Sequence, residues 1–265
     1  PAGAFGGGVT GVIALAAPAD EQLASPLGRT SPLVKLGIAL VWLLGLVLTL
    51  DPRPPLILIA LAVGAGLVLG RIPARRLAAG LLPLWSVAVG IGVFNALFSG
   101  TNVDPTLAEF ARLGPFRVTE QAVANGVAIA LRVLTIAAVG VVFGLTTDST
   151  RLVDALVQQG RLPERFGYGA LAAYQAIPRL AEALTTLRQA RRIRGLRTSW
   201  HPSILVGLLV LAIRHGDRLA LAMDARAFGA GPRSRYREVR WTALDGIVGV
   251  TAIVALVGAL AVGAA

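Results

Sequence analysis

The sequence predicts an all-α fold: a polytopic membrane protein with about five transmembrane helices and one polar cytoplasmic domain of amphipathic helices. Two compositional values support this class. Hydrophobic residues make up 55% of the chain and charged residues only 15%, whereas about a quarter of the residues of an ordinary soluble domain are charged. The mean hydropathy is +0.72. The third observation is the arrangement, in which long apolar runs flank a single extended polar segment.

Five apolar runs are candidates for membrane spans. A helix needs about 20 apolar residues to cross the hydrocarbon core of a bilayer. By this measure the last three runs are long enough to cross, the first run is just long enough, and the second run is short. The runs cover residues 33–50, 56–70, 77–98, 122–145 and 241–263. A further apolar stretch at 203–213 is too short to cross, which favours an amphipathic or interfacial helix there.

The basic residues predict the orientation of the chain. Segment 146–240 holds 16 of the 25 Lys and Arg residues against 7 of the 14 acidic ones, a net charge of +9, and such segments stay on the cytoplasmic side. We therefore expect a multi-pass protein of the cell (plasma) membrane with a cytoplasmic N-terminus. The predicted parts are an N-terminal arm (1–30), transmembrane helices 1–4 (31–145), the cytoplasmic domain (146–240) and a C-terminal transmembrane helix (241–265).

Composition also limits the chemistry. The chain has no Cys and two His, so thiol catalysis and a protein-built metal centre are not expected. Lys35 is the single lysine, and the chain lacks the Gly-rich loop with its Lys that holds nucleotide phosphates. We expect no cofactor, no catalytic residues and no nucleic-acid partner, because cytoplasmic loops and anionic lipids explain the basic charge.

Two amphipathic helices in the polar segment end in a similar way. The first is expected at about 179–195, after a break at Pro178, and the second at about 202–228. Each ends with an Arg shortly before a Gly: Arg194 before Gly195, and Arg226 three residues before Gly229. Arg near a helix C-terminus followed by Gly is a common cap, and Arg is equally suited to a bidentate contact with a partner's carboxylates. Both interpretations remain open from the residues alone.

The order of short motifs in this segment resembles a known family, the transmembrane T component of energy-coupling factor (ECF) transporters (EcfT or CbiQ-like permeases). The resemblance covers roughly residues 30–260. The matching residues are Thr146-Thr147, Leu162-Pro163, Ile177-Pro178, Ala190 to Gly195 and Leu219 to Arg226.

The resemblance implies a coupling domain in which two crossed helices each dock a tripeptide of the Ala-Arg-Gly type into one of two ABC-type ATPase subunits. It also implies a small membrane substrate-capture (S) subunit, which topples in the bilayer during vitamin or metal-ion (cobalt) uptake. The implied docking residues are Ile193, Arg194, Gly195, Ala225, Arg226 and Ala227. The chain departs from the usual tripeptides at Ile193, where Ala is usual, and at Ala227, where Gly is usual.

Other cations have two possible roles each. A basic face at the end of the first amphipathic helix is expected to contact anionic lipid, a partner or both; it consists of Arg188, Arg191, Arg192 and Arg197. Arg132 falls inside the fourth span, where a charge usually marks function or an internal partner. It is expected either to tie spans or the capture subunit together, or to pair with Asn95 or Asp245.

A second function from another class also fits the composition: a stand-alone membrane carrier or channel with a basic cytoplasmic domain. The two hypotheses differ in one observable. A carrier or channel transports its substrate when this chain alone is placed in vesicles, whereas a coupling subunit does not.

Overall fold

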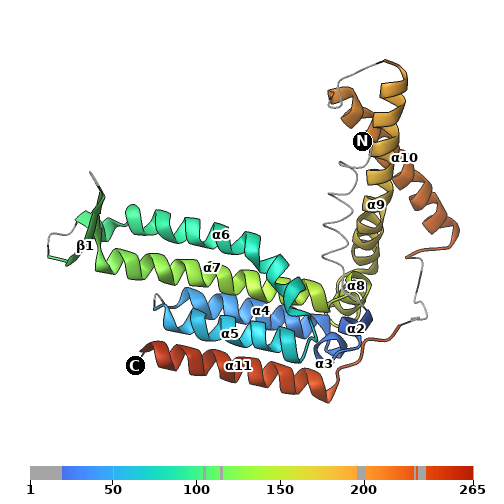
Figure 1. Cartoon of the computed structure of the whole chain (residues 1–265). Helices are drawn as coiled ribbons and strands as arrows, with labels where there is room; N and C mark the ends of the chain where they lie inside the picture. The colour runs from blue at the N-terminus through green and yellow to red at the C-terminus, as the bar shows by residue number, and fades with distance from the viewer. Residues whose placement is uncertain are drawn as a thin grey trace. The chain divides into compact units, whose positions relative to one another are not determined.

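The computed structural model describes residues 20–49, 51–103, 106–113, 116–195, 201–229, 231 and 237–264 (Figure 1). Contacts among the residues divide the chain into two compact units. Ala16–Asp148 and Arg240–Ala265 form the first, here called the membrane unit. The described residues of Ser149–Val239 form the second, here called the polar unit.

The membrane unit is built from five apolar helices that run side by side in Figure 1. They are α4 (Pro32–Val47), α5 (Arg53–Val68), α6 (Ala74–Leu97), α7 (Glu120–Thr146) and α11 (Ala243–Ala264). Three of the described helices are long and apolar enough to cross a membrane, namely those at Ala74–Asn102, Glu120–Thr146 and Ala243–Gly263. The helices α4 and α5 have 16 residues each, which corresponds to a length of about 24 Å. The all-helical membrane fold is therefore confirmed, with two of the five helices shorter than a full span.

The core of this unit lies where α4, α5, α7 and α11 meet. Leu46 and Leu58 are fully buried there, and Ala138 and Ala259 let the helices approach each other closely. Trp42 is buried in the same cluster, and its indole Nε1 donates a hydrogen bond of 2.9 Å to the carbonyl of Ala252. Trp42 thus packs between α4 and α11, because a buried indole N–H needs an acceptor.

A close helix crossing joins α6 to α7 at two glycines. A Cβ atom on Gly126 would lie 2.6 Å from the carbonyl oxygen of Gly92, and one on Gly92 would lie 2.8 Å from that of Gly126. No side chain larger than hydrogen fits at either position without movement of the backbone. Small residues of this kind permit the tight packing that holds helices together in a bilayer.

Buried polar contacts connect the ends of α4, α7 and α11. The Asp245 carboxylate accepts hydrogen bonds from the backbone N–H of Ser31 at 2.6 Å and of Thr242 at 2.8 Å. The ammonium group of Lys35 donates to the carbonyl of Thr146 at 2.9 Å. Asp245 is only 3% exposed, so it is an internal cap shared by two helix starts.

The segment before α4 is partly structured. Residues 1–19 of the predicted N-terminal arm lie outside the described part of the chain, whereas α2 (Asp20–Leu23) and α3 (Pro26–Arg29) are short helices. Leu27 is buried and its backbone N–H donates to the carbonyl of Leu69. The last ten residues of the predicted arm therefore pack as part of the membrane unit.

The loop predicted at 99–121 contains elements that the sequence analysis missed. After η1 (Gly100–Val103), the strands β1 (Glu109–Leu113) and β2 (Phe116–Thr119) form an antiparallel hairpin with a register irregularity between Glu109 and Ala111. Arg117 pairs with Glu109 at 3.4 Å. The hairpin leads directly into α7, whose first turn is capped by the side chain of Thr119.

Candidate docking site

The polar unit begins with a short amphipathic helix, α8 (Ser149–Gln158). It ends two residues before Gly160, and Leu162-Pro163 leads into the next helix, α9 (Glu164–Ile193). The two helices meet at Gly167, where an added Cβ would lie 2.5 Å from Cγ2 of Val157. This close contact fixes the start of α9 against α8.

The expected break at Pro178 is wrong. The helix α9 is continuous over 30 residues with Pro178 inside it, so the helix predicted at 179–195 is its C-terminal half. Proline removes one backbone hydrogen bond from a helix interior. The helix continues because tertiary packing holds it on both sides of the proline, at Gly167 by α8 and at Leu187 by the next helix.

That next helix, α10 (Pro202–Ala225), starts where the sequence predicted. The side chain of His201 accepts a hydrogen bond from the backbone N–H of Ser203, and Pro202 occupies the first helical turn. The expected end at 228 is three residues too late, because Arg226 is already the C-cap.

Helices α9 and α10 contact each other in antiparallel order. An added Cβ on Gly207 would lie 3.6 Å from Leu187, and the guanidinium of Arg191 donates to Ser203 Oγ. The end of α9 therefore lies against the start of α10. At the other end, the guanidinium of Arg165 donates to the carbonyl of Gly229 at 3.1 Å.

The two arginine motifs share one backbone conformation. Arg194 and Arg226 are the C-caps of α9 and α10. The residue after each is left-handed: φ is +76° at Gly195 and +51° at Ala227. Ala227 and Phe228 donate their N–H groups to the carbonyls of Asp224 and Met223, which is the hydrogen-bond pattern of a Schellman cap. Ala227 thus adopts the conformation that glycine would adopt at this position, at a cost of about 1–2 kcal/mol.

The second motif is held from outside by residues that the sequence analysis did not single out. The ring of Phe228 contacts that of Tyr168 edge-on, with centroids 6.4 Å apart. The Tyr168 hydroxyl donates to the carboxylate of Asp154 at 2.9 Å, and Asp154 is only 6% exposed. A buried carboxylate needs a donor, and Tyr168 supplies it from a position that no sequence pattern connects with Asp154.

The residues predicted to dock are accessible. Ile193, Arg194, Gly195, Ala225, Arg226 and Ala227 are all exposed. Ile193 is 87% exposed. It is the last residue of α9, and the described residues around it do not cover its side chain. An apolar side chain this open is well suited to burial in a partner's groove.

The two arginines lie at opposite ends of the α9–α10 pair. Arg226 precedes Phe228, which contacts Tyr168 near the start of α9, whereas Arg194 caps the end of that helix. From Tyr168 to Arg194 the helix rises about 39 Å at 1.5 Å per residue. The structure therefore does not bring the two motifs together into one site; it separates them by roughly the diameter of a small domain.

The basic face follows the last turns of α9. Arg188 and Arg191 are half-buried and Arg192 is exposed. Arg191 is held by its contact with Ser203. Arg197, the fourth predicted member, lies outside the described residues.

Arg132 belongs to neither motif and lies in the membrane unit. Its guanidinium donates to the carbonyl of Thr49, just past the end of α4. The predicted partners are engaged elsewhere: Asn95 donates to Ile91 in its own helix, and Asp245 caps α4 and α11. The expected pairing with Asn95 or Asp245 is therefore wrong. A cation near a helix C-terminus is stabilised by the carbonyl groups there.

The fold and these two exposed helix ends define a multi-pass helical membrane protein whose polar unit presents paired arginine caps. The family profile of the cobalt transport protein (CbiQ) matches residues 24–236. The chain belongs to this family.

Relatives of known description agree with the match. The energy-coupling factor transporter transmembrane protein EcfT of Limosilactobacillus fermentum is 27% identical over 254 residues, 89% of this chain and 92% of that protein. EcfT of Heliobacterium modesticaldum is 29% identical, covering 84% and 88% of the two chains. A protein of Bifidobacterium longum named for ABC transporter ATP binding is 30% identical over 69% of this chain and 25% of its own length. The chain is thus an EcfT-like, CbiQ-like transmembrane component of ECF transporters.

Proposed function

We propose that this chain transmits the movement of two ABC-type ATPase subunits to a small substrate-capture (S) subunit, which topples in the membrane for vitamin or metal-ion uptake. The observation that carries the proposal is the pair of exposed arginine C-caps, Arg194 and Arg226, with one backbone conformation and opposite positions on the α9–α10 pair. ATP hydrolysis is assigned to the partner chains.

The spacing of the motifs supports two separate ATPase contacts. Arg194 lies about 39 Å of helix rise from Tyr168, the residue that contacts Phe228 beside Arg226, so we expect each arginine to meet its own partner surface. The relative from Bifidobacterium longum, named for ABC transporter ATP binding, contains a segment similar to 69% of this chain. A T-component segment and an ATP-binding protein thus occur in one polypeptide, which supports their functional association.

The orientation follows from charge. The segment 146–240 carries a net charge of +9, and basic segments beside membrane spans stay in the cytoplasm, where ATPases are found. This charge supports our proposal that α9 and α10 lie on the side of the ATPases, with the N-terminus of the chain in the cytoplasm. The basic face of Arg188, Arg191, Arg192 and Arg197 then meets the anionic inner leaflet, a partner, or both.

The test is replacement of both docking arginines by Glu in the full chain, co-expressed with the candidate ATPases and capture subunit of the same organism. Arg194→Glu with Arg226→Glu is expected to abolish ATPase co-purification and uptake of the substrate, since each Glu repels the carboxylates that an Arg would grip. The matched control is Arg214→Glu with Arg218→Glu, which makes the same charge change on exposed positions of α10. Unchanged co-purification and uptake in the docking variant would refute the docking role.

A second measurement separates coupling from independent transport. Vesicles that contain this chain alone are expected to show no uptake, whereas addition of the ATPases, the capture subunit and ATP restores it. Uptake by the isolated chain would instead identify a stand-alone carrier or channel. Mass spectrometry of the co-purified proteins then names the ATPases and the capture subunit, and the capture subunit narrows the class of substrate.

A further inference from the structure

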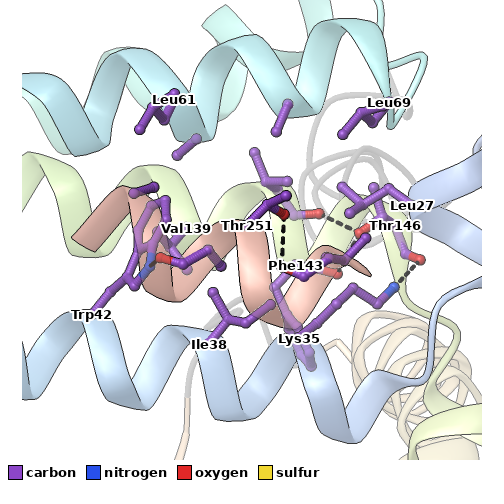
Figure 2. Close-up of a pocket in the computed structure, with 16 residues that line it drawn as sticks. Leu27, Lys35, Ile38, Trp42, Leu61, Leu69, Val139, Phe143, Thr146 and Thr251 are labelled. Carbon is purple, nitrogen blue, oxygen red and sulfur yellow. Dashed lines mark hydrogen bonds between the residues drawn. The ribbon is translucent and has the colours of Figure 1, made fainter. Parts of the chain in front are cut away.

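A cavity of about 270 Å³ lies inside the membrane unit, between α4, α5, α7 and α11 (Figure 2). Its wall is almost entirely apolar. Trp42 closes one end, and Lys35 and Thr146 lie at the other, as Figure 2 shows. Lys35 and Trp42 are seven residues apart on α4, so the cavity extends over about 10 Å of helix rise.

Water does not suit this cavity. Its polar groups already have protein partners: Trp42 Nε1 donates to Ala252, and the Thr251 hydroxyl donates to the carbonyl of Ile247 in its own helix. A buried water needs two to four polar partners, and these walls offer few. An empty cavity, in turn, deprives all lining atoms of contacts. An apolar occupant therefore fits best.

The cavity is accessible from the lipid side. Two of its lining residues, Leu61 on α5 and Leu69 at the C-cap of α5, are 43% and 41% exposed. Figure 2 shows both side chains along the edge of the cavity that α5 forms. A lipid tail can thus reach the cavity from the bilayer without separation of the helices.

The end at Lys35 carries the charge that suits an anionic headgroup. Lys35 is 7% exposed and donates to the Thr146 carbonyl, so its ammonium is held at a fixed place. Arg29 and Arg71, both exposed, follow the lining residues Leu27 and Leu69 by two residues each. Arg29 and Arg71 stand at the ends of α3 and α5, whereas the Asp245 carboxylate at this end is already bound by Ser31 and Thr242.

We propose that this cavity is a binding site for an anionic phospholipid, with one acyl chain between Lys35 and Trp42 and the phosphate beside Lys35. The length of the cavity matches an acyl segment of roughly eight carbons, since about 10 Å of helix rise separates its ends. By filling the cavity, the acyl chain stabilises the packing of the four helices that line it. This role is independent of ATPase docking.

The experiment is native mass spectrometry of the full chain in mild detergent, titrated with phosphatidylglycerol or phosphatidylcholine. One phosphatidylglycerol is expected to remain bound, about fivefold more tightly than phosphatidylcholine, because one cation near an anionic lipid contributes about 1 kcal/mol. Lys35→Gln is expected to remove this preference, and Lys35→Arg to retain it.

Cavity-filling variants test the position of the lipid. Ala65→Phe adds bulk to the lining and is expected to lower lipid retention at least tenfold, whereas Val254→Phe, on the exposed face of α11, leaves it unchanged. If Ala65→Phe fails to fold, Ala255→Leu makes the smaller change at the opposite wall. Equal retention in the lining and control variants, equal binding of the two lipids, or occupancy by detergent alone would each overturn the proposal.

Discussion

Phe228, two residues after Arg226, stands edge-on to Tyr168, with ring centroids 6.4 Å and ring planes 79° apart. The contact joins the end of α10 to the start of α9. Tyr168 is fixed in turn by its hydrogen bond to the buried Asp154. The conformation around Arg226 thus depends on side chains about 60 and 70 residues earlier in the sequence.

Tyr168→Phe tests this dependence. The change keeps the ring but leaves the buried Asp154 carboxylate without its donor, at a cost of about 1–3 kcal/mol. Amide hydrogen exchange at Ala227 and Phe228 is expected to become about tenfold faster, since 1.4 kcal/mol is a factor of ten. The control is Tyr174→Phe, on an exposed position of the same helix. Equal exchange in both variants would show that the ring contact alone fixes the cap.

Gly195 and Ala227, which follow the two arginines, both have a left-handed backbone conformation. Exchanging Gly for Ala at the first and Ala for Gly at the second is expected to change stability in opposite directions. Gly195→Ala is expected to destabilise the end of α9 by about 1 kcal/mol, and Ala227→Gly to stabilise the end of α10 by a similar amount. An added Cβ at Gly195 has open space around it, so the first effect comes from the backbone alone. Thermal unfolding and local hydrogen exchange measure both. Destabilisation by Ala227→Gly would mean that chain entropy outweighs the strain at +51°.

The crossing of α6 and α7 predicts a sharp difference between two neighbouring glycines. Gly92→Ala is expected to cost about 1–3 kcal/mol, because its Cβ meets the opposite backbone and the helices must separate. Gly90 lies two residues earlier on the same helix, and an added Cβ there has open space. Gly90→Ala is therefore expected to stabilise the protein by up to about 1 kcal/mol through its higher helix propensity. The midpoint of thermal denaturation in detergent compares them. If both variants had the same midpoint, the close crossing of α6 and α7 would not contribute to the stability of the protein.

Asp245 predicts a loss of stability in the membrane unit. Asp245→Ala removes the acceptor of the buried Ser31 N–H and of the N–H of the exposed Thr242, and loss of the buried acceptor is expected to cost about 1–3 kcal/mol. Faster proteolysis near 30–31 and 242 measures the opening of these helix starts. Asp51→Ala is the control, since its carboxylate accepts one exposed hydrogen bond from Arg53, and there a change of at most about 1 kcal/mol is expected.

Local patterns in the sequence were sufficient for much of the fold. The apolar runs predicted all five helices of the membrane unit, and His201-Pro202 marked the start of α10, because span length and capping depend on neighbouring residues. The hairpin of β1 and β2 was missed, since strands of five and four residues with a register irregularity carry little periodic signal.

The remaining differences arise from tertiary contacts. Pro178 predicts a helix end in isolation, yet packing on either side of it maintains α9. The contacts of Tyr168 with Asp154 and Phe228, and of Arg132 with Thr49, join positions whose spacing in sequence carries no pattern. Arg194 and Arg226 were recognised in the sequence as similar helix ends, but their common C-cap geometry needed the backbone.

Pro178 also affects the stiffness of α9 in the polar unit. The helices α9 and α10 contact each other near Leu187 and Gly207 and again near Arg165 and Gly229. Arg194 and Arg226, their C-caps, therefore lie at opposite ends of the pair. The helix α9 lacks one backbone hydrogen bond at Pro178, which makes this turn its most compliant point. If α9 bends, the bend is therefore expected at Pro178, about midway between the two contacts with α8 and α10.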